Sequence, residues 1–238
     1  MFKLNEYEVS IIVPAFNEDQ RLPVFLKDCL DFLKNKKGYE LILVNDGSTD
    51  NTIDVMMKAA EINSNLKIVT YKQNGGKGWA VKKGVEVANG QKIIFIDADG
   101  SIHPDQIPYM IEKLNDYDVV VGDRSSKDSH VHQPSLRKLT GGLFNLYVRI
   151  LFNNNRYDNL CGFKGFRKEV AKDLFYELHD YGWVFDVELF HKIKNKGCRI
   201  YSLPLVWEHK EASKLKITDP FKMLLRLIRL RIKLRGNR

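Results

Sequence analysis

The stretch KIIFIDADG at residues 92–100 decides the fold, because a short apolar run ends in two carboxylates, Asp97 and Asp99, and a glycine. An isoleucine-rich run of this length, bounded by turn residues, predicts a buried strand. In sheets of parallel strands, functional side chains gather outside the carboxyl ends of the strands. The stretch therefore predicts an α/β sheet with a polar site at one of its edges.

The same alternation recurs on both sides of this stretch. Runs rich in valine and isoleucine predict strands at residues 9–13, 40–44, 66–71, 92–96 and 118–121. Apolar residues at three- and four-residue steps between these runs predict helices. Strands that alternate with helices form a mainly parallel sheet covered on both faces. After residue 123 we expect helices near 139–151 and 186–196, a strand near 199–206 and a final helix.

The composition is that of an ordinary globular protein, with 238 residues of which 44% are hydrophobic and 29% charged, so disordered and collagen-like classes are excluded. Cys29, Cys161 and Cys198 cannot by themselves form a disulfide framework or a thiolate zinc site. The chain has no GxxxxGKS/T or GxGxxG motif, which argues against P-loop NTPases and dinucleotide-dependent dehydrogenases. We expect no secretory leader, because the N-terminal apolar run is short and is interrupted by Pro14. We expect no spanning helix, because no window approaches about 18 consecutive apolar residues.

The net charge of +8 is concentrated at the C-terminal end. Residues 213–238 carry nine basic side chains against Asp219, so residues 1–212 are neutral overall. Basic and aliphatic residues there fit an amphipathic helix at a membrane interface. We therefore expect a folded domain over 1–212 and a basic tail over 213–238 on an anionic membrane surface. Nucleic acid is the alternative partner, but the tail lacks the interleaved aromatic residues of single-strand binders.

The acids at the strand ends suggest a metal site. Asp97 and Asp99 flank Ala98, so both carboxylates can point to one side of the loop. Mg²⁺ and Mn²⁺ prefer oxygen ligands and often take one or two carboxylates together with phosphate oxygens of a substrate. Asp46, in VNDGSTD, follows another strand, where a turn or helix cap is the alternative to ligand binding. The loop NGGKGWA offers backbone amides and Lys77 to a diphosphate.

Taken in order, IIVPAFNE, VNDGSTD, NGGKGWA and FIDADG resemble the nucleotide-sugar half of family 2 glycosyltransferases, which have the GT-A fold. DNLCGFKGFRKE, WVFDVELF and VWEHKEASKL, followed by the basic helix, resemble the polyprenyl-phosphate branch of that family, in particular the dolichyl-phosphate β-glucosyltransferases. The resemblance spans residues 9–235. It implies a Rossmann-like GT-A domain with a nucleotide-sugar half over about 1–123 and an acceptor half over about 124–212.

The resemblance also implies roles on the donor side. Pro14, Phe16 and Glu18 match the motif that holds the nucleotide, and Asp46 matches the residue that contacts the base. Asn45 stands where an acid is frequent, which leaves uridine and guanosine both open as the base. The diphosphate and the cation would be held by Lys77, Asp97, Ala98, Asp99 and Ser101.

On the acceptor side, Arg124 and Arg137 match arginines that hold the lipid phosphate. Guanidinium groups suit this role because they bind two phosphate oxygens at once. Asp158 matches an acid next to the acceptor and would join Asp97 and Asp99 in catalysis by orienting the nucleophile.

The sugar would be bound by the acids Asp186 and Glu188 through its hydroxyl groups and by the ring of Trp183. The alternative interpretation of the two acids is a charge pair at a helix N-terminus beside a core aromatic residue.

As a whole, the resemblance implies an inverting, metal-dependent hexosyltransferase that uses Mg²⁺ or Mn²⁺. Glucose from UDP-glucose is the favoured donor, and dolichyl or another polyprenyl phosphate is the acceptor. We expect the protein to act peripherally at the cytoplasmic face of a membrane. GDP-mannose as the donor, or a saccharide as the acceptor, are the alternatives within the family.

Overall fold

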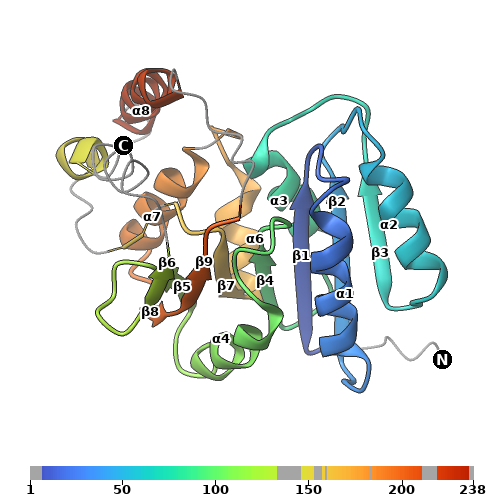
Figure 1. The fold of residues 1–238 in the computed structure, drawn as a ribbon. Coiled ribbons are helices and arrows are strands. Elements are labelled where there is room, and N and C mark those ends of the chain that lie inside the picture. The colour runs from blue at the N-terminus through green and yellow to red at the C-terminus, as the bar shows by residue number, and fades with distance from the viewer. Residues whose placement is uncertain are drawn as a thin grey trace, which may run out of the picture.

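A seven-stranded sheet forms the centre of the molecule in this computed structural model, which describes residues 7–132, 146–152, 157–158, 160–182, 184–210 and 219–235 (Figure 1). The strands are β1 (Val9–Ala15), β2 (Tyr39–Asn45), β3 (Leu66–Thr70), β4 (Lys92–Ile96), β5 (Val119–Asp123), β7 (Phe163–Arg167) and β8 (Ile200–Pro204). Their order is β3-β2-β1-β4-β7-β5-β8, and β7 runs antiparallel to both of its neighbours while the other pairs are parallel. A separate parallel pair joins β6 (His130–His132) to β9 (Val206–Glu208).

The predicted mainly parallel α/β sheet is therefore confirmed. The five strands predicted in the first half are all present, with ends shifted by two residues or fewer. The sequence does not predict β7, because Lys164 and Arg167 interrupt its apolar residues. Since β7 lies between β4 and β5, it places the segment that precedes it beside the end of β4.

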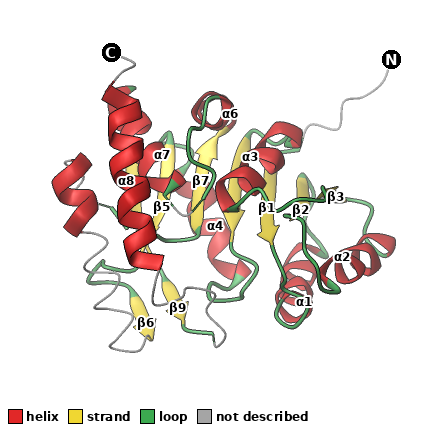
Figure 2. Ribbon diagram, turned by 90° about the horizontal axis from the view of Figure 1, so that it is seen from above, coloured by secondary structure: helices red, strands yellow, loops and turns green. Residues whose placement is uncertain are grey.

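Helices cover both faces of the sheet (Figure 2). They are α1 (Leu22–Leu33), α2 (Thr52–Glu61), α3 (Lys77–Val87), a 3-10 turn η1 (Pro104–Gln106), α4 (Ile107–Lys113), α6 (Lys168–Tyr176), α7 (Phe185–Asn195) and α8 (Asp219–Arg235). α1, α2 and α4 pack in one core with Ile11 and Leu43, and α3, α6 and α7 pack in the other with Ile12 and Ile42. This division follows from the strand period of two, which sends successive side chains to opposite faces.

The C-terminal helix α8 packs on the body of the domain. Leu227 and Leu230 are buried in one apolar cluster with Val184 and Val187, next to the helical residues 146–152. The helix expected within the basic tail is thus present, and one side of it belongs to the folded domain. Within the described part of the chain, no helix is both long and apolar enough to cross a membrane.

Candidate active site

The candidate active site lies outside the carboxyl ends of β1, β2 and β4. β2 lies on one side of β1 and β4 on the other, so the strand order reverses between β1 and β4. Parallel α/β sheets bind ligands at such a position. Pro14 is the last residue but one of β1 and Phe16 follows that strand, so the motif predicted to hold the nucleotide lies at this edge.

The loop after β1 is tied to the loop after β2. Asn17 adopts a left-handed φ of 53°, and its Oδ1 accepts a hydrogen bond from the Thr49 N–H at 2.8 Å. The Glu18 N–H donates to Thr52 Oγ1 at 2.7 Å. The Glu18 carboxylate accepts two hydrogen bonds from the Arg21 guanidinium, at 2.6 and 2.7 Å. These contacts fix the backbone of both loops where the nucleotide is expected.

Asp46 holds the glycine-rich loop that leads into α3. Its carboxylate accepts hydrogen bonds from the Tyr71 hydroxyl, the Asn74 amide and the N–H groups of Gly75 and Gly76, at 2.8–3.0 Å. Burial raises the pKa of Asp46, and these four hydrogen bonds oppose that rise. These hydrogen bonds of the Asp46 carboxylate thus come from a loop 25–30 residues further along the chain, while Asn45 accepts the local hydrogen bond from the Ser48 N–H, and contact of Asp46 with a base stays a prediction.

Lys77, the first residue of α3, meets Asp97, which follows β4. Lys77 Nζ lies 2.6 Å from one carboxylate oxygen of Asp97 and 2.9 Å from the other. Burial alone would lower the pKa of Lys77, but Asp97, Asp186 and Asp99 outweigh it and raise that pKa. Burial and the neighbouring Asp99 raise the pKa of Asp97, against the effect of Lys77. Ala98, between the two acids, is buried.

The residues after β4 fit a divalent cation. Asp99 accepts a hydrogen bond from the Ser101 N–H at 2.9 Å, across a turn in which Gly100 has a φ of +71°. A Cβ atom at Gly162 would lie 1.8 Å from Asp97 Oδ2, so the absence of a side chain there makes room for the carboxylate. In the described part of the chain, no group of three His, Cys, Asp or Glu side chains could hold a metal. Asp97 and Asp99 supply carboxylate oxygens, and Mg²⁺ usually binds through one or two carboxylates together with substrate phosphates.

Asp186, at the start of α7, is buried in an ion pair. Its Oδ1 lies 2.8 Å from Lys164 Nζ, and the two side chains are 4% and 1% exposed. Lys164 also donates to the Cys161 carbonyl at 2.6 Å, and its Nζ lies about 5.5 Å from the ring centres of Phe95 and Phe190. Burial raises the pKa of Asp186, and the nearby lysines oppose that rise. Among the described residues, Asp186 Oδ1 accepts no hydrogen bond of normal geometry.

Arg124 and Asp158, predicted to act separately, form one bidentate pair. Arg124 Nε and Nη2 donate to the two oxygens of Asp158, at 2.6 and 2.8 Å. The Arg124 guanidinium also lies 5.6 Å from the ring centre of Trp207. Burial would raise the pKa of Asp158, but the hydrogen bonds and charge of Arg124 hold it below its usual range. Arg137 lies outside the described residues.

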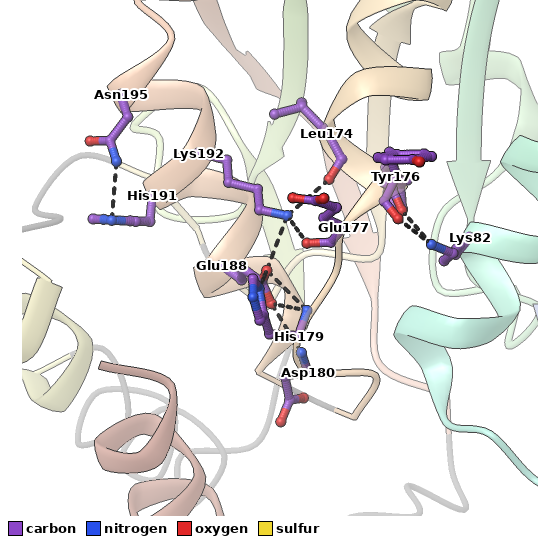
Figure 3. Close-up of polar contacts among 11 residues, drawn as sticks. Lys82, Leu174, Tyr176, Glu177, His179, Asp180, Glu188, His191, Lys192 and Asn195 are labelled. Carbon is purple, nitrogen blue, oxygen red and sulfur yellow. Dashed lines mark hydrogen bonds and ion pairs between the residues drawn. The ribbon is translucent and has the colours of Figure 1, made fainter. Parts of the chain in front are cut away.

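Glu188 is fully buried and faces the loop after α6 (Figure 3). Its carboxylate accepts hydrogen bonds from the N–H groups of His179 and Asp180, at 2.8–3.0 Å, and contacts His179 Nδ1 at 2.8 Å and Lys192 Nζ at 3.1 Å. Both oxygens are thus engaged within the protein, as in the helix-terminus alternative. Trp183 lies outside the described residues.

Two residues of the site are missing from the sequence predictions, Lys164 and Gly162. A lysine between Phe163 and Phe166 in GFKGF is a signal that could have been used, because a cation among aromatic residues in a strand needs a buried acid as its partner. The need for Gly162 follows only from its approach to Asp97, which depends on the pairing of β4 with β7.

Comparison with protein families gives a match of residues 10–175 to the family described as glycosyl transferase family 2. Similar curated proteins are dolichyl-phosphate beta-glucosyltransferases. The one named ALG5D from Trichomonas vaginalis is 33% identical, with all of this chain and 77% of the relative covered. The Dictyostelium discoideum protein is 34% identical over 95% of this chain and 73% of its own. The Homo sapiens protein is 32% identical over 87% of this chain and 69% of its own.

Solved structures share the fold. Glucosyl-3-phosphoglycerate synthase from Mycobacterium tuberculosis in complex with UDP matches 95% of this chain and 79% of its own, with a TM-score of 0.69 and 16% identity. A complex of that enzyme with Mn²⁺, UDP-glucose and phosphoglyceric acid gives a TM-score of 0.70 at 17% identity, over 94% of this chain and 79% of its own. S. aureus TarS in complex with UDP-GlcNAc gives 0.60 at 21% identity, over 94% of this chain and 66% of its own.

Proposed function

The chain belongs to glycosyltransferase family 2, has the GT-A fold and is a glycosyltransferase, and from this premise we propose that it transfers glucose from UDP-glucose to dolichyl or another polyprenyl phosphate. The observation that carries the proposal is the convergence of Lys77, Asp97 and Asp99 at the reversal of the strand order, in a chain similar to dolichyl-phosphate beta-glucosyltransferases. The reaction is proposed to invert the anomeric configuration, because the lipid phosphate attacks the sugar directly.

On the donor side, Asp97 and Asp99 would hold Mg²⁺ or Mn²⁺, with Ser101 nearby, and Lys77 would contact the diphosphate. The cation supplies charge neutralisation of the departing nucleoside diphosphate. The loops after β1 and β2 would enclose the nucleotide, with Asp46 fixing the second wall through Gly75 and Gly76.

On the acceptor side, Arg124 would bind the lipid phosphate with the nitrogen that Asp158 leaves free, together with Arg137. A phosphomonoester has a second pKa of roughly 6, so it is largely dianionic at neutral pH and attacks without a strong base. Asp158 would then orient the nucleophile by fixing the plane of the Arg124 guanidinium. Asp186, whose Oδ1 accepts no hydrogen bond of normal geometry among the described residues, would accept one from a sugar hydroxyl, with Trp183 against the ring.

We place the protein peripherally at the cytoplasmic face of a membrane through α8. Leu225, Ile228 and Ile232 are exposed on this helix, and Ile150 is exposed on the helical residues 146–152, which share its apolar cluster. Exposed aliphatic side chains among arginine and lysine suit an anionic lipid surface. Flotation with vesicles should therefore require anionic lipid and should weaken in Ile228→Ser/Ile232→Ser. Equal flotation of wild type with neutral vesicles would contradict this placement.

The decisive experiment incubates the purified protein with Mg²⁺ or Mn²⁺, a short polyprenyl phosphate and one sugar nucleotide at a time. Mass spectrometry of the lipid fraction should show a metal-dependent hexosyl-phospholipid from UDP-glucose. The same product from GDP-mannose alone would replace the proposed donor. Transfer to a saccharide with no lipid product would remove the acceptor assignment and the roles of Arg124 and Arg137.

A further inference from the structure

The loop between α6 and α7 is held from one side by a single buried carboxylate. Glu188 accepts hydrogen bonds from the His179 and Asp180 N–H groups and contacts the His179 ring (Figure 3). Lys192, one turn further along α7, contacts the same carboxylate at 3.1 Å. Two backbone donors of the loop are thus satisfied by one side chain that is fully buried.

The other side of this loop caps α3. The N-cap residue of α3 is Gly76, which has no side chain to cap the helix, and the Gly78 N–H donates to the Tyr181 carbonyl at 2.8 Å. The Trp79 and Tyr181 rings also pack edge to face, 4.9 Å apart. A Cβ atom at Gly76 would lie 2.5 Å from the Tyr181 oxygen, so the loop touches the backbone of α3. The first turn of α3 therefore has its position set by the loop.

Lys77 stands between these two contact points. Its neighbours Gly76 and Gly78 both touch the loop, and its Nζ lies 2.6 Å from Asp97. Asp46 fixes the backbone that precedes the helix through the Gly76 N–H, at 3.0 Å. The connection thus runs from Glu188 to the backbone of His179 and Asp180, and from the adjoining Tyr181 to the glycines on either side of Lys77.

We propose that Glu188 is a positioning residue for donor binding, which holds the loop at 179–181 so that Tyr181 sets α3 and Lys77 against Asp97. This inference rests on the proposed use of Lys77 and Asp97 to bind the sugar nucleotide. It gives Glu188 a role through the protein backbone, in place of direct contact with the sugar. Displacing a binding group by about 1 Å is enough to change catalysis by roughly 100-fold.

Glu188→Gln tests the proposal with Glu40→Gln as the matched control. Glu40 is also a fully buried carboxylate, bonded to a loop N–H (Asn89) and to a lysine (Lys67), but it lies at the opposite end of the sheet. In both variants the new amide NH2 group faces hydrogen-bond donors that the carboxylate had accepted from. Both variants should therefore lower the free energy of unfolding. Only Glu188→Gln should raise the KM for UDP-glucose. We expect a rise of roughly 10- to 100-fold, which is the usual effect of removing a residue that orients a ligand-binding group. The KM for the lipid phosphate should stay unchanged.

A second pair of variants perturbs α3 without changing a charge. Gly78→Ala places a Cβ atom 3.1 Å from Tyr181 Cα in the loop and 2.7 Å from Phe185 Cβ. Gly84→Ala, further along α3, places a Cβ atom 2.4 Å from Ile12 Cγ2 of β1. Gly78→Ala should reproduce the donor effect, and Gly84→Ala should not. Hydrogen exchange at residues 77–81 should speed up in Glu188→Gln and Gly78→Ala relative to their controls.

Equal donor KM values in Glu188→Gln and Glu40→Gln would overturn the proposal, as would unchanged exchange at the start of α3 in Glu188→Gln. If wild-type protein formed no lipid product from UDP-glucose, the proposed function would fail instead. The exchange measurement would still decide whether Glu188 positions α3, because it needs neither substrate.

Discussion

Removing one member of the buried Lys164–Asp186 pair should destabilise the fold strongly. The side chains are 1% and 4% exposed and their charged atoms lie 2.8 Å apart. Lys164→Met leaves the Asp186 carboxyl group in the core without its lysine partner. That group can lose its charge only by binding a proton. At pH 7 this costs about 4 kcal/mol for a group with an ordinary pKa of about 3.9. Asp186→Leu leaves a buried ammonium, for which about 3–5 kcal/mol is typical.

Removing both charges should restore most of the stability. Lys164→Met/Asp186→Leu keeps a similar volume, and its main remaining loss is the hydrogen bond to the Cys161 carbonyl, about 1 kcal/mol. Urea unfolding of the four proteins gives the coupling energy. Transfer activity should stay lost in the double variant, because that variant lacks the Asp186 carboxylate that is proposed to accept a hydrogen bond from the sugar.

Two results would refute the stability argument, and a third would refute the role of Asp186 in transfer. Single variants that cost under about 1 kcal/mol would behave as an exposed ion pair does. A double variant as unstable as the singles would mean that packing, and not charge, holds this region. Recovery of transfer in the double variant would remove Asp186 from the reaction.

The remaining predictions concern the acids of the site. Asp99→Asn should abolish transfer and leave the urea midpoint unchanged, and turnover near that of wild type would exclude Asp99 from a metal site. Gly162→Ala should lower kcat/KM by roughly 100-fold, because its Cβ atom would displace Asp97 from 1.8 Å away; unchanged kinetics would show that the carboxylate can move freely. Asp158→Asn should destabilise the protein at pH 7 by about 3 kcal/mol, since it leaves the Arg124 charge without its partner. The pKa of Asp158 is lowered in the folded state, so its stabilisation is fully present above about pH 4 and is lost as the pH falls through the folded value. The difference in unfolding free energy between wild type and Asp158→Asn should therefore shrink in acid, and a constant difference would contradict the pairing.

The sequence correctly predicts that Asp46, Lys77 and Asp97 lie at one edge of the sheet, for a geometric reason. Asp46 and Asp97 each follow a short apolar strand, and the carboxyl ends of parallel strands share one edge of a sheet. Knowing the strands is therefore enough to bring these side chains to the same region. Lys77 is found in the same way, because it opens the helix after a strand of that group.

The acceptor side is less accessible to this reasoning. The contact between Arg124 and Asp158, 34 residues apart, requires β7 to enter the sheet antiparallel between β4 and β5. Lys164 makes β7 hard to predict from the sequence. A lysine within a short apolar run argues against a buried strand unless its acidic partner is known. Glu188 shows the same limit: its position in a helix is predictable, but its loop partners are not.

The charges of the site favour a cation as part of donor binding. Among the described residues, Lys77, Arg124 and Lys164 each pair with one carboxylate, and Asp99 has no such partner. These described side chains therefore carry no excess of positive charge that could neutralise a sugar diphosphate and a lipid phosphate together. An added divalent charge beside Asp99 meets this need without breaking the two buried pairs of Arg124 and Lys164, which hold the acceptor side in place.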